Sequence, residues 1–190
     1  NVDVKAATQK GVLVVNSPGG NTIAAAEHTI AMMLALSRNI PIANSSTFLG
    51  KWERKKFVGN ELFKKKLGVV GLGKIGTHVA KVANALGMDV YGYDPFVSSE
   101  RAQQLQVKLS ELKTLFAESD YVTLHLPRTS ETENLVDMKV LQSMKNDAKL
   151  INCARGGIID EEALAEALNN SLIGGAAIDV FAKEPLDSNS

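Results

Sequence analysis

The sequence that decides the fold is Leu67-Gly68-Val69-Val70-Gly71-Leu72-Gly73-Lys74-Ile75-Gly76. Its first four residues are an apolar run typical of a buried strand, and a helical pattern begins directly after the loop. In this order the first glycine permits a tight turn, the second lets the backbone approach a pyrophosphate, and the third lets helix and strand pack closely. The helix N-terminus adds free N–H donors and a positive dipole end. Gly71, Gly73 and Gly76 therefore predict a dinucleotide-binding loop.

An acidic residue follows the next apolar strand. The strand predicted at 89–93 ends at Asp94, which is 21 positions after Gly73. A carboxylate at this place is expected to accept hydrogen bonds from the adenosine ribose and to repel the additional phosphate of NADP. The alternative is that Asp94-Pro95 forms only a turn. With the glycine loop, the carboxylate favours NAD as the cofactor.

The remaining periodicities alternate between strand and helix. Apolar runs predict strands at 11–15, 67–70, 89–93, 121–124, 149–152 and 176–179. Helical spacing predicts helices at 22–37, 40–49, 74–86, 99–105, 110–118, 137–144 and 161–169, and 51–62 reads as a loop. Short connections between alternating elements imply a parallel sheet covered on both faces. We therefore expect an α/β, doubly wound, Rossmann-type domain with ligands at the carboxyl ends of its strands.

The composition excludes several classes of protein. Formal net charge is zero over 190 residues, so neither nucleic acid nor an anionic membrane is an expected partner. The longest apolar stretch, 23–36, is too short to span a bilayer and contains Glu27 and His28. One cysteine, Cys153, precludes an internal disulfide and favours a cytoplasmic setting. We see no signal peptide, although the chain begins at Asn1 without a methionine.

Three charged residues lie at or beyond predicted strand ends. Arg155 follows the strand at 149–152, and its guanidinium suits a substrate carboxylate, although a surface arginine is the alternative. Asp179 closes an apolar strand and so needs a polar partner or a ligand such as the nicotinamide carboxamide. Glu184 can orient a histidine acid/base, or it is a solvated loop residue. Together they predict an active-site edge.

The cysteine and the three histidines give weaker signals. Cys153 has no evident basic partner nearby in sequence, so we expect it to pack against the cofactor rather than act as a nucleophile. His28 and His78 are expected to be packed or solvent-facing, whereas His125 ends a strand and can lie near the adenine. The histidines are far apart in sequence and show no metal-ligand spacing. We therefore expect no metal site.

Together these motifs resemble the D-isomer-specific 2-hydroxyacid dehydrogenases. The resemblance rests on the glycine loop, on Asn152-Cys153-Ala154-Arg155-Gly156-Gly157 with Asp160-Glu161, and on Asp179-Val180-Phe181 with Glu184-Pro185. Three further stretches indicate a member that acts on a phosphorylated 2-hydroxy acid. They are Asn16-Ser17-Pro18-Gly19-Gly20-Asn21-Thr22, Ala26-Glu27-His28-Thr29 and Lys51-Trp52-Glu53-Arg54-Lys55-Lys56-Phe57. Two alternatives remain: a glyoxylate or hydroxypyruvate reductase, and an NAD-sensing binding module similar to the family's corepressors.

The resemblance implies roles for individual residues. Arg155 binds the substrate carboxylate, Glu184 pairs with the catalytic histidine, and Asp179 holds the nicotinamide amide. Lys74 and Ile75 lie on the pyrophosphate. The full set expected at the cofactor is Gly71, Gly73, Lys74, Ile75, Gly76, Asp94, His125, Leu126, Pro127, Cys153, Ala154, Arg155 and Asp179.

The chain departs from the family pattern in two respects. The family's catalytic histidine follows the Glu-Pro pair in a His-x-Gly-Ala context, and none of the three histidines here matches it. Residues 1–190 therefore resemble an excised central NAD-binding domain, with the substrate domain largely absent, and we expect NAD binding with negligible turnover. Lys64 stands where relatives often have glycine, which should change only a turn. The resemblance also implies a homo-oligomer, formed through the helix at 22–37, unless that helix only covers the sheet.

Overall fold

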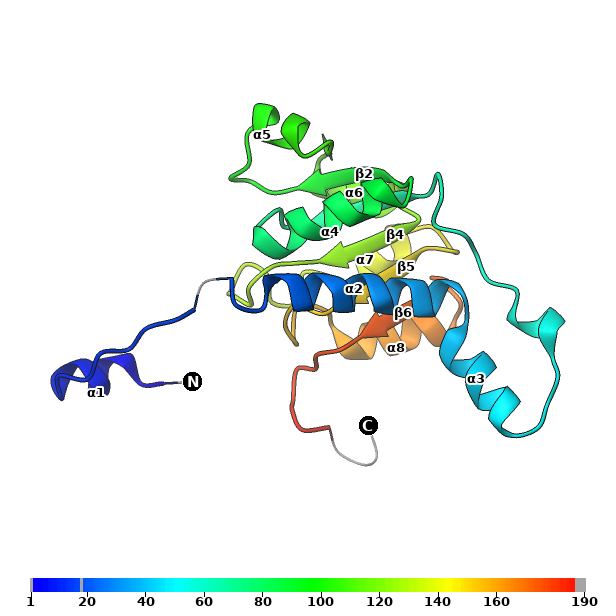
Figure 1. Cartoon of the computed structure of the whole chain (residues 1–190), viewed down its shortest axis with the longest axis horizontal. Helices are drawn as coiled ribbons and strands as arrows, with labels where there is room; N and C mark the ends of the chain where they lie inside the picture. The colour runs from blue at the N-terminus through cyan, green and yellow to red at the C-terminus, as the bar shows by residue number, and fades with distance from the viewer. Residues whose placement is uncertain (1, 18, 187–190) are drawn as a thin grey trace.

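The fold is built on a parallel β-sheet (Figure 1). The structure, a computed structural model, describes residues 2–17 and 19–186. The sheet has six strands in the order β3-β2-β1-β4-β5-β6, and every neighbouring pair is parallel. The strands are β1 (Lys66–Val70), β2 (Asp89–Tyr93), β3 (Lys108–Leu109), β4 (Tyr121–Leu124), β5 (Lys149–Asn152) and β6 (Gly175–Ile178). This order confirms the predicted doubly wound fold and puts its crevice where the order reverses, between β1 and β4.

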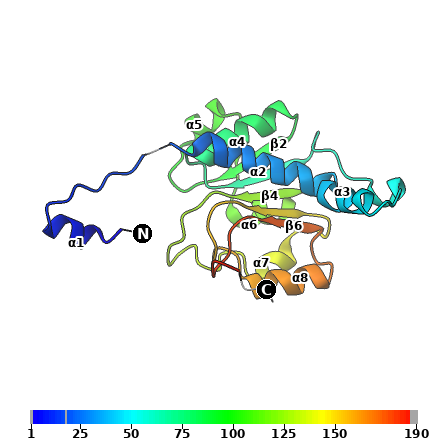
Figure 2. The same cartoon turned by 60° about the horizontal axis from the view of Figure 1, so that its bottom comes forward.

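Helices cover both faces of the sheet (Figure 2). One layer contains α2 (Thr22–Ser37) and α4 (Lys74–Ala85), which pack against each other. The opposite layer contains α6 (Leu112–Glu118), α7 (Met138–Ser143) and α8 (Glu161–Asn169), and α5 (Ser99–Gln104) packs on β3.

A separate apolar core fills the space on each side of the sheet. Leu67 and Val69 of β1 belong to the core under α2 and α4, whereas Val70 belongs to the core under α6, α7 and α8. Successive strand side chains point to opposite faces, so a strand between two helical layers must be apolar on both. This is why β1 reads as a continuous apolar run.

The boundaries of most elements agree with the sequence prediction, but the strand predicted at 11–15 is wrong. Residues 12–17 belong to no strand, and Leu13 is 86% exposed. An apolar run becomes a strand only when a neighbour accepts and donates its backbone hydrogen bonds, and this segment extends away from the sheet (Figure 1). It follows α1 (Val4–Gln9), a helix that the sequence did not predict and that has no buried residue. The short strand β3 was also missed.

A second extension leaves the body after α2. The predicted helix at 40–49 is confirmed as α3 (Ile40–Phe48), and the loop that follows contains a 3₁₀ turn, η1 (Arg54–Phe57). Large apolar side chains are exposed along it, including Trp52 at 80%. Figure 1 shows this extension and α1 at opposite ends of α2.

The turn before β1 explains the departure at Lys64. This residue has φ of +61°, in the left-handed region, and its N–H donates to the carbonyl of Gly87. Glycine enters that region without steric cost, whereas a side chain is strained there. The turn is preserved with lysine at this position.

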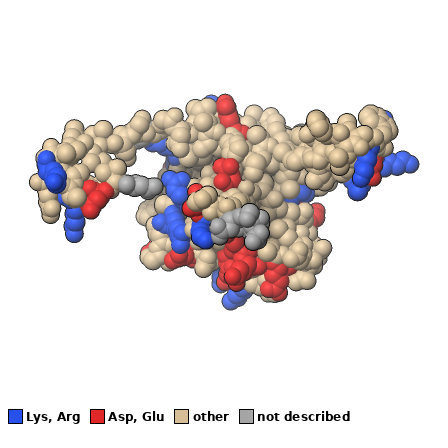
Figure 3. All heavy atoms as spheres, turned by 90° about the horizontal axis from the view of Figure 1, so that it is seen from below, with Lys and Arg blue, Asp and Glu red and all other residues tan. Residues whose placement is uncertain are grey.

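No helix among residues 2–17 and 19–186 combines the length and the apolar character needed to cross a membrane. On the face drawn in Figure 3, basic and acidic side chains both occur, and neither sign covers it continuously.

Candidate functional site

The glycine loop joins β1 to α4 through three positions that lack a side chain for different reasons. Gly71 has φ of +95°, and a Cβ there would lie 2.6 Å from the carbonyl oxygen of His125. A Cβ on Gly76 would lie 2.0 Å from the carbonyl oxygen of Gly71. A Cβ on Gly73 would meet no described atom within 4 Å. Gly71 and Gly76 are therefore needed because a side chain at either position would clash with the backbone. Gly73 instead leaves open space beside the backbone.

That open space lies at the N-terminus of α4. Gly73 is the N-cap residue, and among the described residues no side chain hydrogen-bonds to this end of the helix. Lys74 and Ile75 form its first turn. Backbone N–H groups at such an end suit a phosphate group, so the loop fits the pyrophosphate of a dinucleotide.

Asp94 lies directly beside the glycine loop. Its Oδ2 accepts a hydrogen bond from the Leu72 N–H at 2.8 Å, and its Oδ1 accepts one from the Phe96 N–H at 2.9 Å. The contact with Phe96 makes Asp94 part of a turn, as the alternative interpretation proposed. A carboxylate has about four acceptor positions, so it retains capacity for ribose hydroxyls as well.

A cleft of about 600 Å³ opens along the carboxyl ends of β1, β2 and β4. This volume falls within the range of roughly 300–1,000 Å³ that is typical of small-molecule sites. Six of the predicted cofactor residues line it together: Gly71, Gly73, Asp94, His125, Leu126 and Pro127. Tyr93, Phe96 and Leu112 add apolar walls. An apolar cleft with a carboxylate at one side fits the adenosine half of NAD.

His125 forms part of this cleft as a neutral side chain. Burial lowers the pKa of its imidazole from 6.5 to about 4. Its Nε2 lies 3.0 Å from the Thr123 hydroxyl. A ring that stays neutral at pH 7 can pack against an adenine but supplies no positive charge to the phosphates.

Arg155 and Glu184 line a second, shallower hollow of about 380 Å³ together with Ala154. Arg155 is exposed, and its guanidinium donates a hydrogen bond to the Ala154 carbonyl at 2.6 Å. The Glu184 carboxylate accepts a hydrogen bond from the Phe181 N–H at 2.9 Å. A Cβ on Gly156 would lie 1.9 Å from the Phe181 carbonyl oxygen. The two loops are therefore in direct backbone contact, and this contact brings the two predicted catalytic side chains to one edge.

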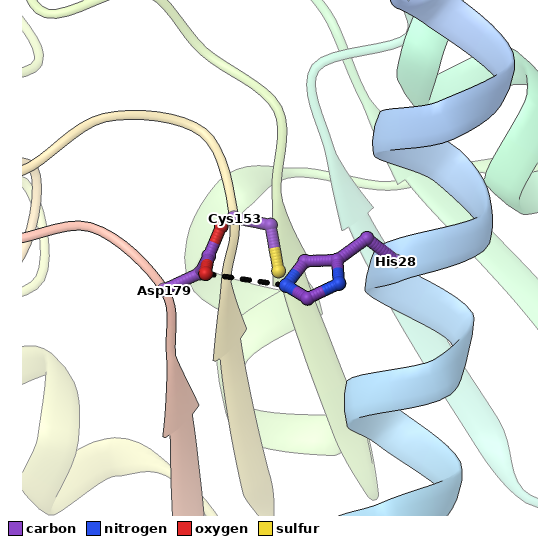
Figure 4. Close-up of side chains that lie close together, drawn as sticks. All are labelled: His28, Cys153 and Asp179. Carbon is purple, nitrogen blue, oxygen red and sulfur yellow. Dashed lines mark ion pairs between the residues drawn. The ribbon is translucent and has the colours of Figure 1, made fainter.

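Between these regions, α2 contributes a histidine that sequence reasoning did not connect to the site. Figure 4 shows His28 pointing from α2 toward Asp179 and Cys153, which follow β6 and β5. His28 Nε2 lies 3.2 Å from Asp179 Oδ1, with the two side chains 48% and 47% exposed. Asp179 thus has the polar partner that its position requires.

The environment of Cys153 corrects one prediction and supports another. A basic side chain, His28, does lie nearby, contrary to the sequence expectation. Burial nevertheless raises the pKa of the Cys153 thiol, and a hydrogen bond with Thr29 opposes that shift. A thiol held protonated is a poor nucleophile, which agrees with a packing role.

The expectation of no metal site rested only on sequence separation. In the structure His28, Cys153 and Asp179 each offer a ligand atom, and these atoms lie within 4.8 Å of one another. Only the packing of α2 across β5 and β6 brings them together. His78, by contrast, lies on α4 outside these clefts, beside Lys74 and Lys81.

The fold and this strand-end site define a class of protein. A family model described as "D-isomer specific 2-hydroxyacid dehydrogenase, NAD binding domain" matches residues 30–190. The chain belongs to this family, and its cofactor is NAD.

Curated relatives narrow the similarity to particular proteins. The chain is 61% identical over 186 residues to D-3-phosphoglycerate dehydrogenase of Synechocystis sp., covering 98% of this chain and 34% of the relative. It is 55% identical over 185 residues to D-3-phosphoglycerate dehydrogenase of Archaeoglobus fulgidus, covering 97% and 35%. The chain thus spans about a third of the length of these relatives.

Solved structures agree on the fold. Apo D-lactate dehydrogenase from Escherichia coli matches with a TM-score of 0.90 and 37% identity, covering 97% of this chain and 58% of that one. D-lactate dehydrogenase from Aquifex aeolicus, complexed with NAD and lactic acid, matches with a TM-score of 0.84 and 33% identity, covering 96% and 55%.

Proposed function

We propose that this chain is the central cofactor domain of a cytoplasmic NAD-dependent dehydrogenase that oxidises 3-phospho-D-glycerate to 3-phosphohydroxypyruvate. This is the first step of phosphorylated serine biosynthesis. The observation that carries the proposal is the joint placement of the glycine loop, Asp94, Asp179, Arg155 and Glu184 along one sheet edge. Identities of 61% and 55% to D-3-phosphoglycerate dehydrogenases support this substrate.

In this proposal each residue has a defined task. The nicotinamide of NAD accepts the hydride from C2 of the substrate. Arg155 binds the substrate carboxylate through two parallel hydrogen bonds. Asp179 accepts a hydrogen bond from the carboxamide N–H of the nicotinamide. Glu184 fixes a histidine acid/base contributed by a part of the protein outside this chain. Pre-arranged charges at these positions favour the geometry of hydride transfer.

The competing functions have less support. The glyoxylate reductase of Paecilomyes thermophila matches the fold with 30% identity, against 61% and 55% for the D-3-phosphoglycerate dehydrogenases of Synechocystis sp. and Archaeoglobus fulgidus. A reductase would prefer small unphosphorylated 2-oxo acids. An NAD-sensing module would show partner binding driven by NADH and no substrate turnover.

Substrate-dependent NADH formation by the full-length protein tests the proposal. We expect kcat/KM for 3-phospho-D-glycerate to exceed that for D-lactate, glycolate and D-glycerate by at least a hundredfold. The 190-residue chain alone should bind NAD but show negligible turnover, since no histidine in it has the family's His-x-Gly-Ala context. Equal turnover of D-glycerate would contradict phosphate recognition, and full activity of the short chain would contradict the missing-histidine interpretation.

We also propose that the protein is a homo-oligomer. One face of α2 is buried against α4 and the sheet, through Ala26, Ile30 and Met33, so this face only covers the sheet. On α2 itself Ile23 stays 50% exposed, and the extension beyond α2 carries a group of exposed large apolar side chains: Ile40, Ile42, Phe48, Leu49 and Trp52. Association through this extension predicts a dimer in sedimentation equilibrium that the double variant Phe48→Ser, Trp52→Ser converts to a monomer.

A further inference from the structure

We propose that His28, Cys153 and Asp179 form a binding site for a borderline-soft divalent cation such as Zn²⁺, at the position proposed for the nicotinamide carboxamide. The three side chains come from α2 and from the ends of β5 and β6 (Figure 4). Their ligand atoms lie within 4.8 Å of one another. Three rigid elements thus converge on one point.

The distances fit a tetrahedral ion. With bonds of about 2.0 Å to nitrogen or oxygen and about 2.3 Å to sulfur, two ligand atoms of a tetrahedral site lie ~3.3–3.6 Å apart. His28 Nε2 and Asp179 Oδ1 already lie 3.2 Å apart. The Cys153 sulfur lies within 4.8 Å of both atoms, so a small shift of this side chain toward the ion would place it at the third corner and leave the fourth to water.

The donor set selects the kind of ion. A thiolate and an imidazole favour Zn²⁺, whereas Mg²⁺ and Ca²⁺ prefer oxygen ligands. On binding, the Cys153 thiol releases its proton to solvent and the thiolate sulfur takes the metal. The thiolate and the Asp179 carboxylate then balance the two positive charges of the ion.

The surroundings hold the ligands and leave an entrance. The Asp179 N–H donates to the Asn152 carbonyl at 3.0 Å, which fixes the end of β6 beside β5. The packing of α2 against β5 and β6 keeps His28 beside the ends of both strands. The half-exposed side chains of His28 and Asp179 give an ion access from solvent.

A cation bound to Asp179 would withdraw that carboxylate from the nicotinamide carboxamide. This consequence rests on the proposed function and makes the site inhibitory, with metal and cofactor in competition. The cation site itself depends only on the three side chains.

Titration of the protein with Co²⁺, a spectroscopic substitute for Zn²⁺, tests the site directly. We expect a one-to-one complex with a thiolate-to-cobalt absorption band that Zn²⁺ abolishes. Cys153→Ser should lose the band, and His28→Gln should bind Co²⁺ at least tenfold more weakly. His78→Gln, a histidine outside the cluster, is the matched control and should bind as the unmodified protein does. Absence of the band in the unmodified protein, or unchanged binding in both cluster variants, overturns the site.

Calorimetric titration with NAD, with and without one equivalent of Zn²⁺, tests the competition. We expect Zn²⁺ to raise the Kd for NAD at least tenfold in the unmodified protein and to have little effect in His28→Gln. A cobalt band with an unchanged Kd for NAD overturns the competition and leaves the ion site. A cobalt band in a protein that binds no NAD contradicts the proposed function and supports the ion site.

Discussion

The two halves of the candidate site are built in opposite ways. The adenosine half joins a continuous loop, Gly71 to Gly76, to the end of the adjacent strand β2, and it forms a cleft of about 600 Å³. The other half combines α2 with the ends of β5 and β6, so that His28 meets Asp179 across 151 sequence positions. The first half is set by local backbone geometry, and the second by tertiary packing.

This difference separates residues that the fold requires from residues that are proposed to contact a ligand. In the adenosine half some positions must lack a side chain because the neighbouring backbone leaves no space for one, as at Gly76. In the other half the important groups are side chains that solvent can reach, such as the half-exposed Asp179 and the exposed Arg155. We therefore expect substitutions in the first half to affect folding most and substitutions in the second to affect ligands or turnover.

The largest effect is expected from alanine at Gly76, with alanine at Gly73 as its matched control. The new Cβ at Gly76 would lie 2.0 Å from the Gly71 carbonyl oxygen, and backbone must move to accept it. Such overpacking should cost about 3 kcal/mol of unfolding free energy, at the upper end of the usual range, measured by urea denaturation. The Gly73 variant should keep its stability within about 1 kcal/mol, since the added methyl meets only open space.

The same pair of variants separates folding from cofactor binding. Gly73→Ala should weaken NAD binding at least tenfold, because the methyl would occupy the space proposed for the pyrophosphate beside the backbone. If both variants lose stability equally, or if Gly73→Ala binds NAD normally, the division between the two glycines is wrong.

The next effect concerns Arg155 in the full-length protein. Arg155→Ala should lower kcat/KM for the hydroxy acid by roughly 10³-fold, since the proposed bidentate contact to the substrate carboxylate would be lost. Arg155→Lys keeps the charge but not the planar fork, so it should recover only part of the loss. Steady-state kinetics with each variant measure this, and urea midpoints should stay unchanged. Full activity of the alanine variant would assign substrate binding to another residue.

The same contrast between local geometry and tertiary packing explains which features could be predicted from the sequence alone. Five of the six strand ranges were predictable because each of these strands forms an apolar run, whereas β3 is two residues long and exposed. Asp137 and Asp160 cap the helices that follow them and mark where those helices begin. The stretch at 11–15 has the same apolar signal but no strand beside it, so the pattern misled. His28 could not be assigned because nothing in the sequence near it indicates how α2 lies across β5 and β6.

His125 offers a smaller effect, seen in the pH dependence of stability. Its pKa falls from 6.5 to about 4 on folding because burial disfavours the charged ring. Between these values the unfolded chain binds a proton that the folded chain does not, so stability rises with pH there. The contribution is complete above pH 6.5 and is lost as pH falls toward 4, by roughly 3 kcal/mol.

Urea denaturation at a series of pH values measures this slope. His125→Gln should flatten the dependence between pH 4 and 6.5, whereas His78→Gln should leave the contribution of His125 in place. An unchanged slope in His125→Gln would mean that the ring is hydrated and that the adenosine half is more open than the structure indicates.

The smallest effect is expected at Asp94, where the two functions of one carboxylate can be separated. Asp94→Asn keeps an oxygen for the N–H of Leu72 or Phe96 but removes the negative charge. We expect the asparagine variant to bind NAD about tenfold more weakly, since hydrogen bonds to a charged acceptor are the stronger ones. Its affinity for NADP should rise, because the repulsion of the 2′-phosphate is gone. Asp94→Ala also removes the contacts to the loop, so any additional loss of NAD affinity measures how far this side chain holds the glycine loop in place. Equal affinities in the two variants would show that Asp94 acts by charge alone and that the loop keeps its shape without it.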